Sequence, residues 1–451
     1  MNASLGMINA FDPAAAAGLD AAERDMIARR QRVLGPSYRL FYQHPVHIVR
    51  GEGVWLYDKA GRKYLDAYNN VPCVGHCHPH VVEAVARQMA VLNTHTRYIG
   101  DEVLDYAERL VATFPPALDQ VMFTCTGSEA NDLALRVAKS ATGGTGIIVT
   151  RLAYHGITET VAGISPSLGA NSPLGADVYL VDAPASASQV DAAETVGTRF
   201  ADGVRAALAQ MEADGVKPAA LIVDTIFSSD GVFAAPHGFL AEAVAAMRAK
   251  GGLFIADEVQ PGFGRTGDAF WGFLRHGLVP DIVTMGKPMG NGYPVAAMVA
   301  RHDVLADFGT RSRYFNTFGG SSAAMAAASA VLDVIESENL RDNALSTGRM
   351  LQEGLANLAS RYPLISDIRG AGLFIGVEIT RETNGRREPA GEEASAIVNG
   401  LRERGVLISA SGPGANVLKI RPPLPFGNAE AALLLNLLDD TLRSIHCSIT
   451  I

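Results

Sequence analysis

The sequence predicts an α/β protein that contains a mostly parallel sheet covered by helices on both faces. Two observations support this prediction. Short apolar runs without polar alternation recur between residues 120 and 285, and helical stretches such as residues 239–251 separate them. Strands of this kind are typical of parallel sheets whose two faces are both buried. Hydrophobic residues make up 48% of the 451-residue chain, which is ample material for such a core.

The first part of the chain precedes this alternating region. Residues 1 to about 35 are rich in alanine and include an amphipathic helical stretch at residues 21–34. Residues 54–68 are typical of two strands joined by a turn at Lys59–Gly61. Six apolar strands are predicted next, at Val121–Thr124, Ile147–Thr150, Val178–Val181, Leu221–Val223, Leu253–Ala256 and Ile282–Met285.

The character of the sequence changes after about residue 330. Long helices are predicted at Ala323–Ser337 and Asn343–Arg361. Strand-like stretches follow at residues 372–380 and 417–424. We therefore expect a separate α+β domain in the last quarter of the chain.

Composition excludes several classes of protein. The net charge of −9 argues against general nucleic-acid binding, which needs a basic face. The four cysteines are too few for a disulfide framework and indicate a reducing compartment. The N-terminal residues lack a basic, apolar leader, and residues 314–332 lack the apolar content of a membrane span. We expect a cytoplasmic protein that binds neither membranes nor nucleic acid. Glycine is enriched, at 46 residues, which hints at close approaches of the backbone.

Ligands of parallel sheets bind at the carboxyl ends of the strands. After the strand at 121–124 come Thr126, Gly127 and Ser128, which open a helical stretch. Free N–H groups at a helix N-terminus, together with hydroxyl groups, form an anion site suited to phosphate. Taken alone, the segment fits an ordinary capped helix better than a phosphate site, and it is not a nucleotide-binding P-loop.

Two charged residues follow other apolar strands. Asp257 comes after the strand at 253–256, where it either caps the next loop or pairs with a buried protonated nitrogen. Lys287 follows the strand at 282–285, where it is either a surface lysine or a desolvated amine nucleophile. A phosphate site, a carboxylate for a pyridinium nitrogen and a lysine for a Schiff base are the parts that hold pyridoxal 5′-phosphate. The combination predicts that cofactor.

The motifs spread along the chain resemble those of the class III, fold-type I pyridoxal-phosphate-dependent aminotransferases. The matching stretches are GHCHP (75–79), TGSEAND (126–132), YHG (154–156), DEVQPGFGRTG (257–267), PDIVTMGKPMGNGYP (280–294) and NTFGG (316–320). The chain most resembles the branch that holds ethanolamine-phosphate phospho-lyases and proteins similar to alanine–glyoxylate aminotransferase 2. The resemblance implies a seven-stranded, mostly parallel sheet in a large domain (76–330). It also implies a smaller α+β domain built from both termini (1–75 and 331–451).

The resemblance also implies roles for individual residues. Lys287 would form the Schiff base and move the substrate proton, and Asp257 would keep the ring nitrogen protonated. The other implied cofactor contacts are Thr126, Gly127 and Ser128 to the phosphate, Tyr154 and Val259 on the two ring faces, Gln260 near the ring hydroxyl, Asp224 and His155 close by, and Thr317 on the phosphate in the partner subunit. His155 fits a purely structural histidine equally well. The role of Thr317 implies a homodimer with active sites at the subunit interface, with further pairing into tetramers left open.

The segment around residue 76 contains several residue types that bind metals. These residues are Cys73, His76, Cys77, His78 and His80. Zinc sites usually pair two such clusters separated along the chain, and here there is one. The GHCHP motif of the family accounts for much of it, so we predict no metal site.

Two basic residues near the C-terminus bear on the substrate. Lys419 stands where many members of the family carry an arginine that holds the substrate carboxylate, and Arg421 follows it. A lysine suits phosphate as well as carboxylate and lacks the planar fork of arginine. The alternative is that Lys419 is a solvated strand residue. Asp224 likewise replaces a glutamate common in the family, so both departures put plain α-amino-acid specificity in doubt.

The leading functional hypothesis is an aminotransferase that moves an amino group between an amine or amino acid and a keto acid or aldehyde. The alternative is a phospho-lyase that eliminates phosphate from an O-phosphorylated amino alcohol such as phosphoethanolamine. The two reactions need nearly the same protein residues, because the leaving group on the substrate decides between them. A non-catalytic regulator on the same fold is a third class. It is disfavoured because Lys287 is present and the acidic N-terminal segment offers no basic recognition helix.

Overall fold

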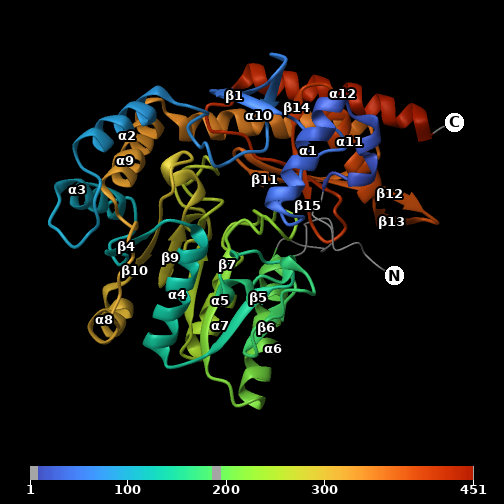
Figure 1. Ribbon diagram of the computed structural model, residues 1–451. Coiled ribbons are helices and arrows are strands. Elements are labelled where there is room, and N and C mark those ends of the chain that lie inside the picture. The colour runs from blue at the N-terminus through green and yellow to red at the C-terminus, as the bar shows by residue number, and fades with distance from the viewer. Residues whose placement is uncertain (1–8, 185–193, 450–451) are drawn as a thin grey trace.

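A computed structural model describes residues 9–184 and 194–449 of the chain (Figure 1). Its largest sheet has seven strands in the order β4-β10-β9-β8-β7-β5-β6. These strands are β4 (Gln120–Thr124), β5 (Gly146–Thr150), β6 (Val178–Val181), β7 (Pro218–Asp224), β8 (Leu253–Asp257), β9 (Ile282–Met285) and β10 (Ala296–Ala300). The strands from β9 to β6 pair in parallel, and β10 pairs antiparallel with β4 and β9. The α/β class and the mostly parallel seven-stranded sheet are confirmed.

The six strands expected from apolar runs all form, whereas β10 was not expected. Its sequence, AAMVA, is dominated by alanine, which has little preference for strands. All five residues are nevertheless buried between the neighbouring strands and helices. The connection from β9 to β10, residues 286–295, is shorter than the dozen or so residues that a parallel crossover needs, so the two strands pair antiparallel.

Two apolar clusters lie on the two faces of the large sheet. Ile147 and Val149 of β5 pack with α4 (Gly127–Thr142) and α8 (His302–Arg311), while Ile148 packs with the cluster that includes α6 (Glu194–Ala213) and α7 (Ala241–Ala249). Successive residues of a strand point to opposite faces. Both faces are therefore covered, which explains why these strands lack polar alternation.

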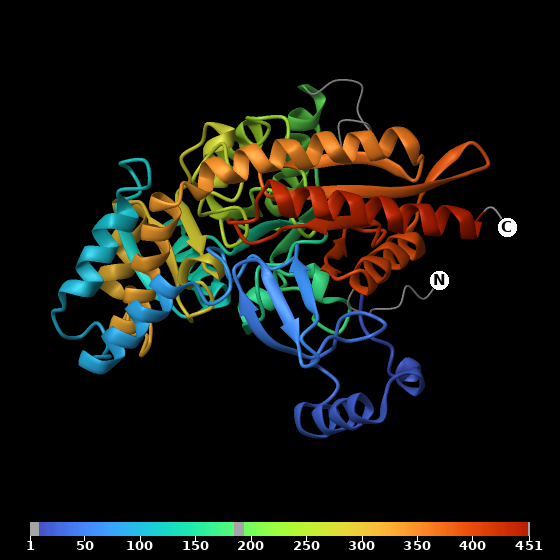
Figure 2. The ribbon, with the colours of Figure 1, turned by 90° about the horizontal axis from the view of Figure 1, so that it is seen from above.

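The two ends of the chain meet in a second sheet. Strands β1 (Ile48–Glu52), β2 (Trp55–Asp58) and β3 (Lys63–Asp66) are antiparallel, and β3 pairs in parallel with β14 (Val406–Leu407). Figure 2 shows these blue strands beside the red C-terminal helices. The arrangement agrees with a smaller α+β unit built from both termini, and the domain boundaries themselves stay a prediction.

A third sheet and several helices complete this part of the molecule. The sheet contains β11 (Ile365–Ala371), β12 (Phe374–Thr383), β13 (Arg386–Pro389), β15 (Ser409–Ser411) and β16 (Val417–Ile420). The helices along it are α10 (Leu340–Arg361), α11 (Gly391–Glu403) and α12 (Asn428–Ile449).

Other helices lie elsewhere in the chain. They are η1 (Pro13–Gly18), α2 (Pro79–Val91), α3 (Asp101–Val111), α5 (Glu159–Ala162), η2 (Pro166–Leu168), η4 (Gly272–His276), η5 (Lys287–Gly290) and α9 (Ser322–Ser337).

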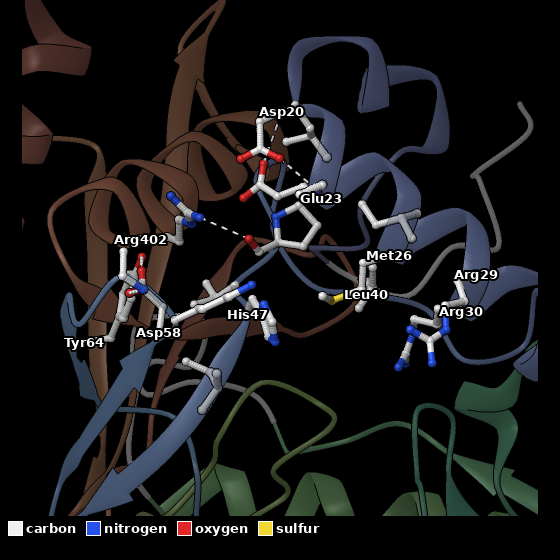
Figure 3. A pocket seen from close by; sticks show the side chains of 18 of the residues that line it. Asp20, Glu23, Met26, Arg29, Arg30, Leu40, His47, Asp58, Tyr64 and Arg402 are labelled. Atoms are coloured by element: carbon white, nitrogen blue, oxygen red, sulfur yellow. Dashed lines mark hydrogen bonds between the residues drawn. The ribbon is translucent and has the colours of Figure 1, made fainter.

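The predicted N-terminal helix forms as α1 (Ala21–Leu34), and none of its side chains is buried. Asp20 and Glu23 cap its first turn reciprocally. A cavity of about 860 Å³ lies between α1 and the β1–β2 hairpin, where Arg402 donates a hydrogen bond to the Pro45 carbonyl (Figure 3). The predicted site residues do not line this cavity, so the chemistry lies elsewhere.

The helices in the described parts of the chain were compared with the length and apolarity that a bilayer requires. None of them is both long and apolar enough to cross a membrane.

Candidate active site

The predicted site residues converge at the carboxyl edge of the large sheet. Asp224 ends β7 and lies in register with Asp257, which ends β8. Asp257 lies in turn in register with Thr284 of β9, three residues before Lys287. The N-terminus of α4, with Gly127, follows β4 at the same edge. Three neighbouring strands and one helix thus bring together residues that are up to 160 positions apart (287 − 127).

The Asp257 carboxylate is buried and held by several donors. Its Oδ1 accepts a hydrogen bond from the Val259 N–H at 3.1 Å. Its Oδ2 accepts one from Asn131 Nδ2 at 3.0 Å and lies 2.7 Å from Nδ1 of His155. A buried carboxylate supported in this way stays fixed in position and can accept one more hydrogen bond from a ligand. The His155 side chain is 1% exposed and contacts the Asp257 carboxylate, so it helps to fix that carboxylate in place.

Lys287 opens η5 directly after β9. Within the described residues, its amine makes no hydrogen bond or ion pair with the protein. Burial lowers the pKa of this amine, and the positive charge of Arg421 lowers it further, whereas Asp257 and Asp224 act in the opposite direction. The lowered pKa increases the fraction of neutral amine, which is the nucleophilic form.

The first turn of α4 forms an anion cradle, with one difference from expectation. The Thr126 hydroxyl accepts from the Glu129 N–H, and the Glu129 carboxylate accepts from the Cys125 and Thr126 N–H groups. Thr126 and Glu129 therefore form a capping box, and the Thr126 hydroxyl is engaged. In the described part of the chain, the N–H groups of Gly127 and Ser128 have no protein acceptor, which leaves them available for an anion.

Glycines allow the close approach of the backbone at this cradle. A Cβ on Gly127 would lie 3.0 Å from the Val259 side chain. Gly156 has a φ of +141°, and a Cβ there would lie 2.4 Å from Ser128 Oγ. Tyr154, two residues before Gly156, is 38% exposed, and Val259 is 7% exposed. An exposed aromatic residue and a buried aliphatic residue are both present to line a flat ring.

The basic residues near the C-terminus lie at the same site. Desolvation lowers the pKa of Lys419 to about 7, and the positive charges of Arg421 and Lys287 lower it too, whereas Asp224 acts in the opposite direction. Lys419 is therefore not a solvated strand residue. Arg421 donates to the Tyr68 carbonyl at 3.2 Å and to Oε1 of Gln260, whose amide donates to Ser228 Oγ at 2.7 Å. Gln260 is thus held by two protein partners.

Several residues at the site were not found from the sequence. Asn131 forms hydrogen bonds with both Asp257 and Thr284. Asp230 is buried, and burial raises its pKa to about 7. The Asp230 carboxylate accepts a hydrogen bond from Thr150 Oγ1 at 2.9 Å. The capping roles of Thr126 and Glu129 could have been predicted from the sequence, because Thr-x-x-Glu before an apolar run is the pattern of a capping box. Asn131 falls in the TGSEAND motif, but the sequence indicated the contacts of neither Asn131 nor Asp230, since their partners are distant in the sequence.

The remaining predicted residues lie as follows. Thr317 is exposed, next to Phe318, which is 69% exposed, and its expected contact with a partner subunit stays a prediction. His76, His78 and His80 contact three different carboxylates, those of Asp66, Glu338 and Asp333. Among residues 9–184 and 194–449, no three His, Cys, Asp or Glu residues are arranged to hold a metal ion.

Comparison with known proteins decides the family. The profile of the family described as aminotransferase class-III matches residues 40–442. The chain belongs to the class III aminotransferases. It is 36% identical to the ethanolamine-phosphate phospho-lyase homolog 1 of Caenorhabditis elegans, over 98% of both chains. It is 38% identical to an alanine–glyoxylate aminotransferase 2-like protein of Drosophila melanogaster, over 92% of this chain and 86% of that one.

A solved structure gives the same family. A phospholyase from Arthrobacter, in complex with phosphoethanolamine, superimposes with a TM-score of 0.90 at 43% identity. The match covers 93% of this chain and 100% of that one. Class III aminotransferases are enzymes of fold-type I that depend on pyridoxal phosphate, so this protein is a pyridoxal-phosphate-dependent enzyme.

The residues present fit that cofactor. Two N–H groups without protein acceptors at the N-terminus of the 16-residue helix α4 suit its phosphate. The buried Asp257 carboxylate suits its ring nitrogen, and the amine of Lys287, which has no protein partner among the described residues, suits its aldehyde. Gly127 provides the space beside Val259 that a larger residue would fill.

Glu258 follows Asp257 in the chain, but its side chain is held by a separate set of buried donors. Its buried carboxylate accepts from Thr225 Oγ1 and from the N–H groups of Gly272 and Phe273, at 2.7, 2.7 and 2.8 Å. We expect Glu258→Ala to lower the melting temperature by about 3–9 °C, because three buried donors lose their acceptor at about 1–3 kcal/mol each and a chain of this length shifts by about 1 °C per kcal/mol.

The control for this prediction is Glu388→Ala, which changes an exposed glutamate. Glu258→Gln keeps one acceptor oxygen and should lose less than Glu258→Ala. Differential scanning calorimetry measures the melting temperatures of the three variants, which should fall most in Glu258→Ala, less in Glu258→Gln and least in Glu388→Ala. Equal melting temperatures for Glu258→Ala and Glu388→Ala would contradict the prediction.

Proposed function

We propose that this class III enzyme is an aminotransferase that moves an amino group between an amine or amino acid and a keto acid or aldehyde. The observation that carries the proposal is the Lys287 amine. It is desolvated, has no protein partner among the described residues, and lies near the carboxylates of Asp257 and Asp224. Such an amine can take up and return a proton without first breaking an ion pair.

Each residue has a defined part in the proposed reaction. Bound pyridoxal phosphate supplies an electron sink for the substrate Cα. Lys287 Nζ removes the proton from Cα and later delivers it, while the anionic Asp257 keeps a proton on the ring nitrogen. Val259 is buried and would exclude water from one face of the ring. Gly127 and Ser128 hold the phosphate through their N–H groups.

A specific observation favours phosphate elimination as a second candidate. The amine of Lys419 makes no hydrogen bond or ion pair with any described residue, and it lies with Arg421 in a desolvated basic pair. Such a pair suits a phosphate on the substrate. If Cβ of the substrate carries that phosphate, loss of the Cα proton allows the Cβ–O bond to break, and its electron pair leaves with the phosphate. The solved Arthrobacter phospholyase bound to phosphoethanolamine supports this candidate.

Phosphoethanolamine distinguishes the two reactions. The holoenzyme is given phosphoethanolamine without a keto acid, and the released inorganic phosphate is measured over many turnovers. In parallel, a panel of amines and amino acids is tested with pyruvate for formation of alanine. Alanine formation without phosphate release supports the aminotransferase. Phosphate release over many turnovers without alanine formation would replace it by the phospho-lyase.

The pKa of Lys419 predicts how substrate binding depends on pH. Because its lowered pKa lies at about 7, Lys419 is a cation below pH 7 and becomes neutral above it. We expect KM for an anionic amino donor to rise about tenfold as pH increases through 7, since one charged contact worth about 1–3 kcal/mol is lost. Steady-state kinetics between pH 6 and 9, from about one unit below the pKa to about two units above it, measure this change.

The matched variant for this prediction is Lys419→Arg, which keeps its positive charge throughout that range. Its KM for the same donor should stay nearly constant with pH. Any titration of the donor itself is shared by both proteins and cancels in the comparison. Identical pH profiles for the two proteins would show that Lys419 does not bind the anionic group.

We also propose that the enzyme is a homodimer in the cytoplasm. Large apolar side chains are exposed, including Ile99 at 96%, Tyr98 at 68% and Phe318, next to Thr317, at 69%. A patch of this kind supports an interface with a second copy. Light scattering of the purified protein tests the dimer, and a monomeric mass would refute it. The unpaired thiols of Cys73, Cys77 and Cys125 support a reducing compartment.

A further inference from the structure

One buried side chain contacts the three elements that build the cofactor site. Asn131 lies on α4, four residues after Gly127, and is 0% exposed. Its Nδ2 donates to Oδ2 of Asp257 at 3.0 Å and to the His155 carbonyl at 2.8 Å. Its Oδ1 accepts from Thr284 Oγ1 on β9 at 2.6 Å. Asn131 thus ties the helix of the phosphate cradle to the ends of β8 and β9.

The orientation of the Asn131 amide is determined by its neighbours. The Asp257 carboxylate and the His155 carbonyl only accept hydrogen bonds, so the NH₂ group must face them. The carbonyl oxygen then faces Thr284, whose hydroxyl donates. A reversed amide would direct its oxygen at two acceptors and would leave buried groups without partners, at about 1–3 kcal/mol each. The amide therefore has one stable orientation.

This fixed amide constrains Asp257. Oδ2 receives donors from two directions, Asn131 and His155, while Oδ1 is held by the Val259 N–H. Asn131 is the member of this set that also bonds to β9, the strand that leads to Lys287. An aspartate at position 131 would instead place a second carboxylate against Asp257, where two like charges cannot both be ionised at low cost.

We propose that Asn131 is a positioning residue of the reaction, which holds the Asp257 carboxylate in the orientation needed at the ring nitrogen and fixes α4 relative to β8 and β9. Thr284 acts through Asn131 by fixing the amide. The proposal rests on the proposed use of Asp257 and Lys287 with pyridoxal phosphate. Asn131 would influence the bound cofactor through Asp257, without contacting the cofactor itself.

The test compares five variants of the full-length protein. Asn131→Ala removes the amide, and Asn131→Asp keeps its shape but adds a charge. Thr284→Val removes the hydroxyl that fixes the amide at nearly constant volume, and Thr284→Ser restores it. Asn343→Ala is the matched control, because Asn343 on α10 also donates from its amide to two carbonyls, those of Leu424 and Phe426, at 2.7 and 3.0 Å.

Four quantities are measured for each variant: kcat, KM, the pH titration of the visible absorbance of the holoenzyme, and the melting temperature of the apoprotein. We expect both Asn131 variants to lose about tenfold to a hundredfold in kcat, the range seen when a hydrogen-bonded support of a reacting group is removed. Their absorbance titration should shift, most in Asn131→Asp. Thr284→Val should show the same changes at smaller size, and Thr284→Ser should resemble the wild type.

The control separates positioning from stability. Asn343→Ala should lower the melting temperature of the apoprotein without changing the absorbance titration or kcat. The inference is overturned if Asn131→Ala matches Asn343→Ala in kcat and titration. If Asn131→Ala does not fold, Thr284→Val decides in the same way. A wild-type protein that binds no pyridoxal phosphate would refute the proposed function itself, which is a different result from unaffected variants of an active wild type.

Discussion

Replacing Lys287 by alanine should abolish turnover, with kcat reduced by about 10⁴-fold or more. The variant loses both the amine that binds the cofactor covalently and the group that moves the substrate proton, and proton transfer alone contributes about 10²–10⁴-fold. The visible absorbance that depends on the bound lysine should disappear as well. Single-turnover kinetics and the absorption spectrum of the purified variant measure the two losses.

Two further variants separate the amine from its charge. Lys287→Arg keeps a cation at the end of β9 but offers no neutral amine near pH 7, so it should be as inactive as Lys287→Ala. Lys217→Ala removes an exposed lysine just before β7, at the opposite edge of the sheet, and should behave as the wild type. Retention of the visible band in Lys287→Ala would refute the assignment.

Replacing Asp257 by alanine should lower kcat by about 10²–10³-fold, or roughly 3–4 kcal/mol in the activation barrier. The carboxylate is a fixed charge in a desolvated site, and removal of one such electrostatic contact costs about this much. Affinity for pyridoxal phosphate should fall too, because the ring nitrogen loses its partner. Titration of the apoprotein with the cofactor and steady-state kinetics give the two values.

Asp281→Asn is the matched control for Asp257. Asp281 is also buried, at 2% exposure, but it lies before β9 at the opposite edge of the sheet, where its carboxylate accepts from Phe254 N–H and pairs with Arg248 and Arg301. Its substitution should lower stability and leave cofactor affinity unchanged. A similar loss of affinity in both variants would mean that Asp257 acts through folding alone.

The sequence allowed the large sheet to be predicted because its strands are buried on both faces. Continuous apolar runs mark such strands, and the residues that follow them, Asp257 and Lys287, fall at one edge by the geometry of parallel pairing. The strand β10 escaped prediction because AAMVA is composed mainly of alanine. Its burial between β4 and β9 is a tertiary effect that overrides weak local preference.

The chemistry of the site was predictable only where a residue carries a local signal. Lys287 and Asp257 are charges after apolar runs, and such a position is costly without a function. Asn131 lies inside a helix, where an asparagine has no special meaning until its contacts are known. Asp230 lies in the loop after β7 and likewise gains its significance from burial against Thr150, which lies in β5. Three-dimensional contacts between distant segments, unlike periodicity, leave no trace in a single sequence.

The pairing of β3 with β14 has a consequence for the order of folding during synthesis. The N–H of Leu65 bonds to the carbonyl of Gly405, so the sheet of β1, β2, β3 and β14 is completed by residues made near the end of translation. The strands of the large sheet, between residues 120 and 300, emerge earlier and can pair among themselves. Until β14 is synthesised, the antiparallel strands β1, β2 and β3 have an unpaired edge at β3. Such an edge is a template for pairing with other chains. Slow translation or C-terminal truncation should therefore expose this edge and favour aggregation.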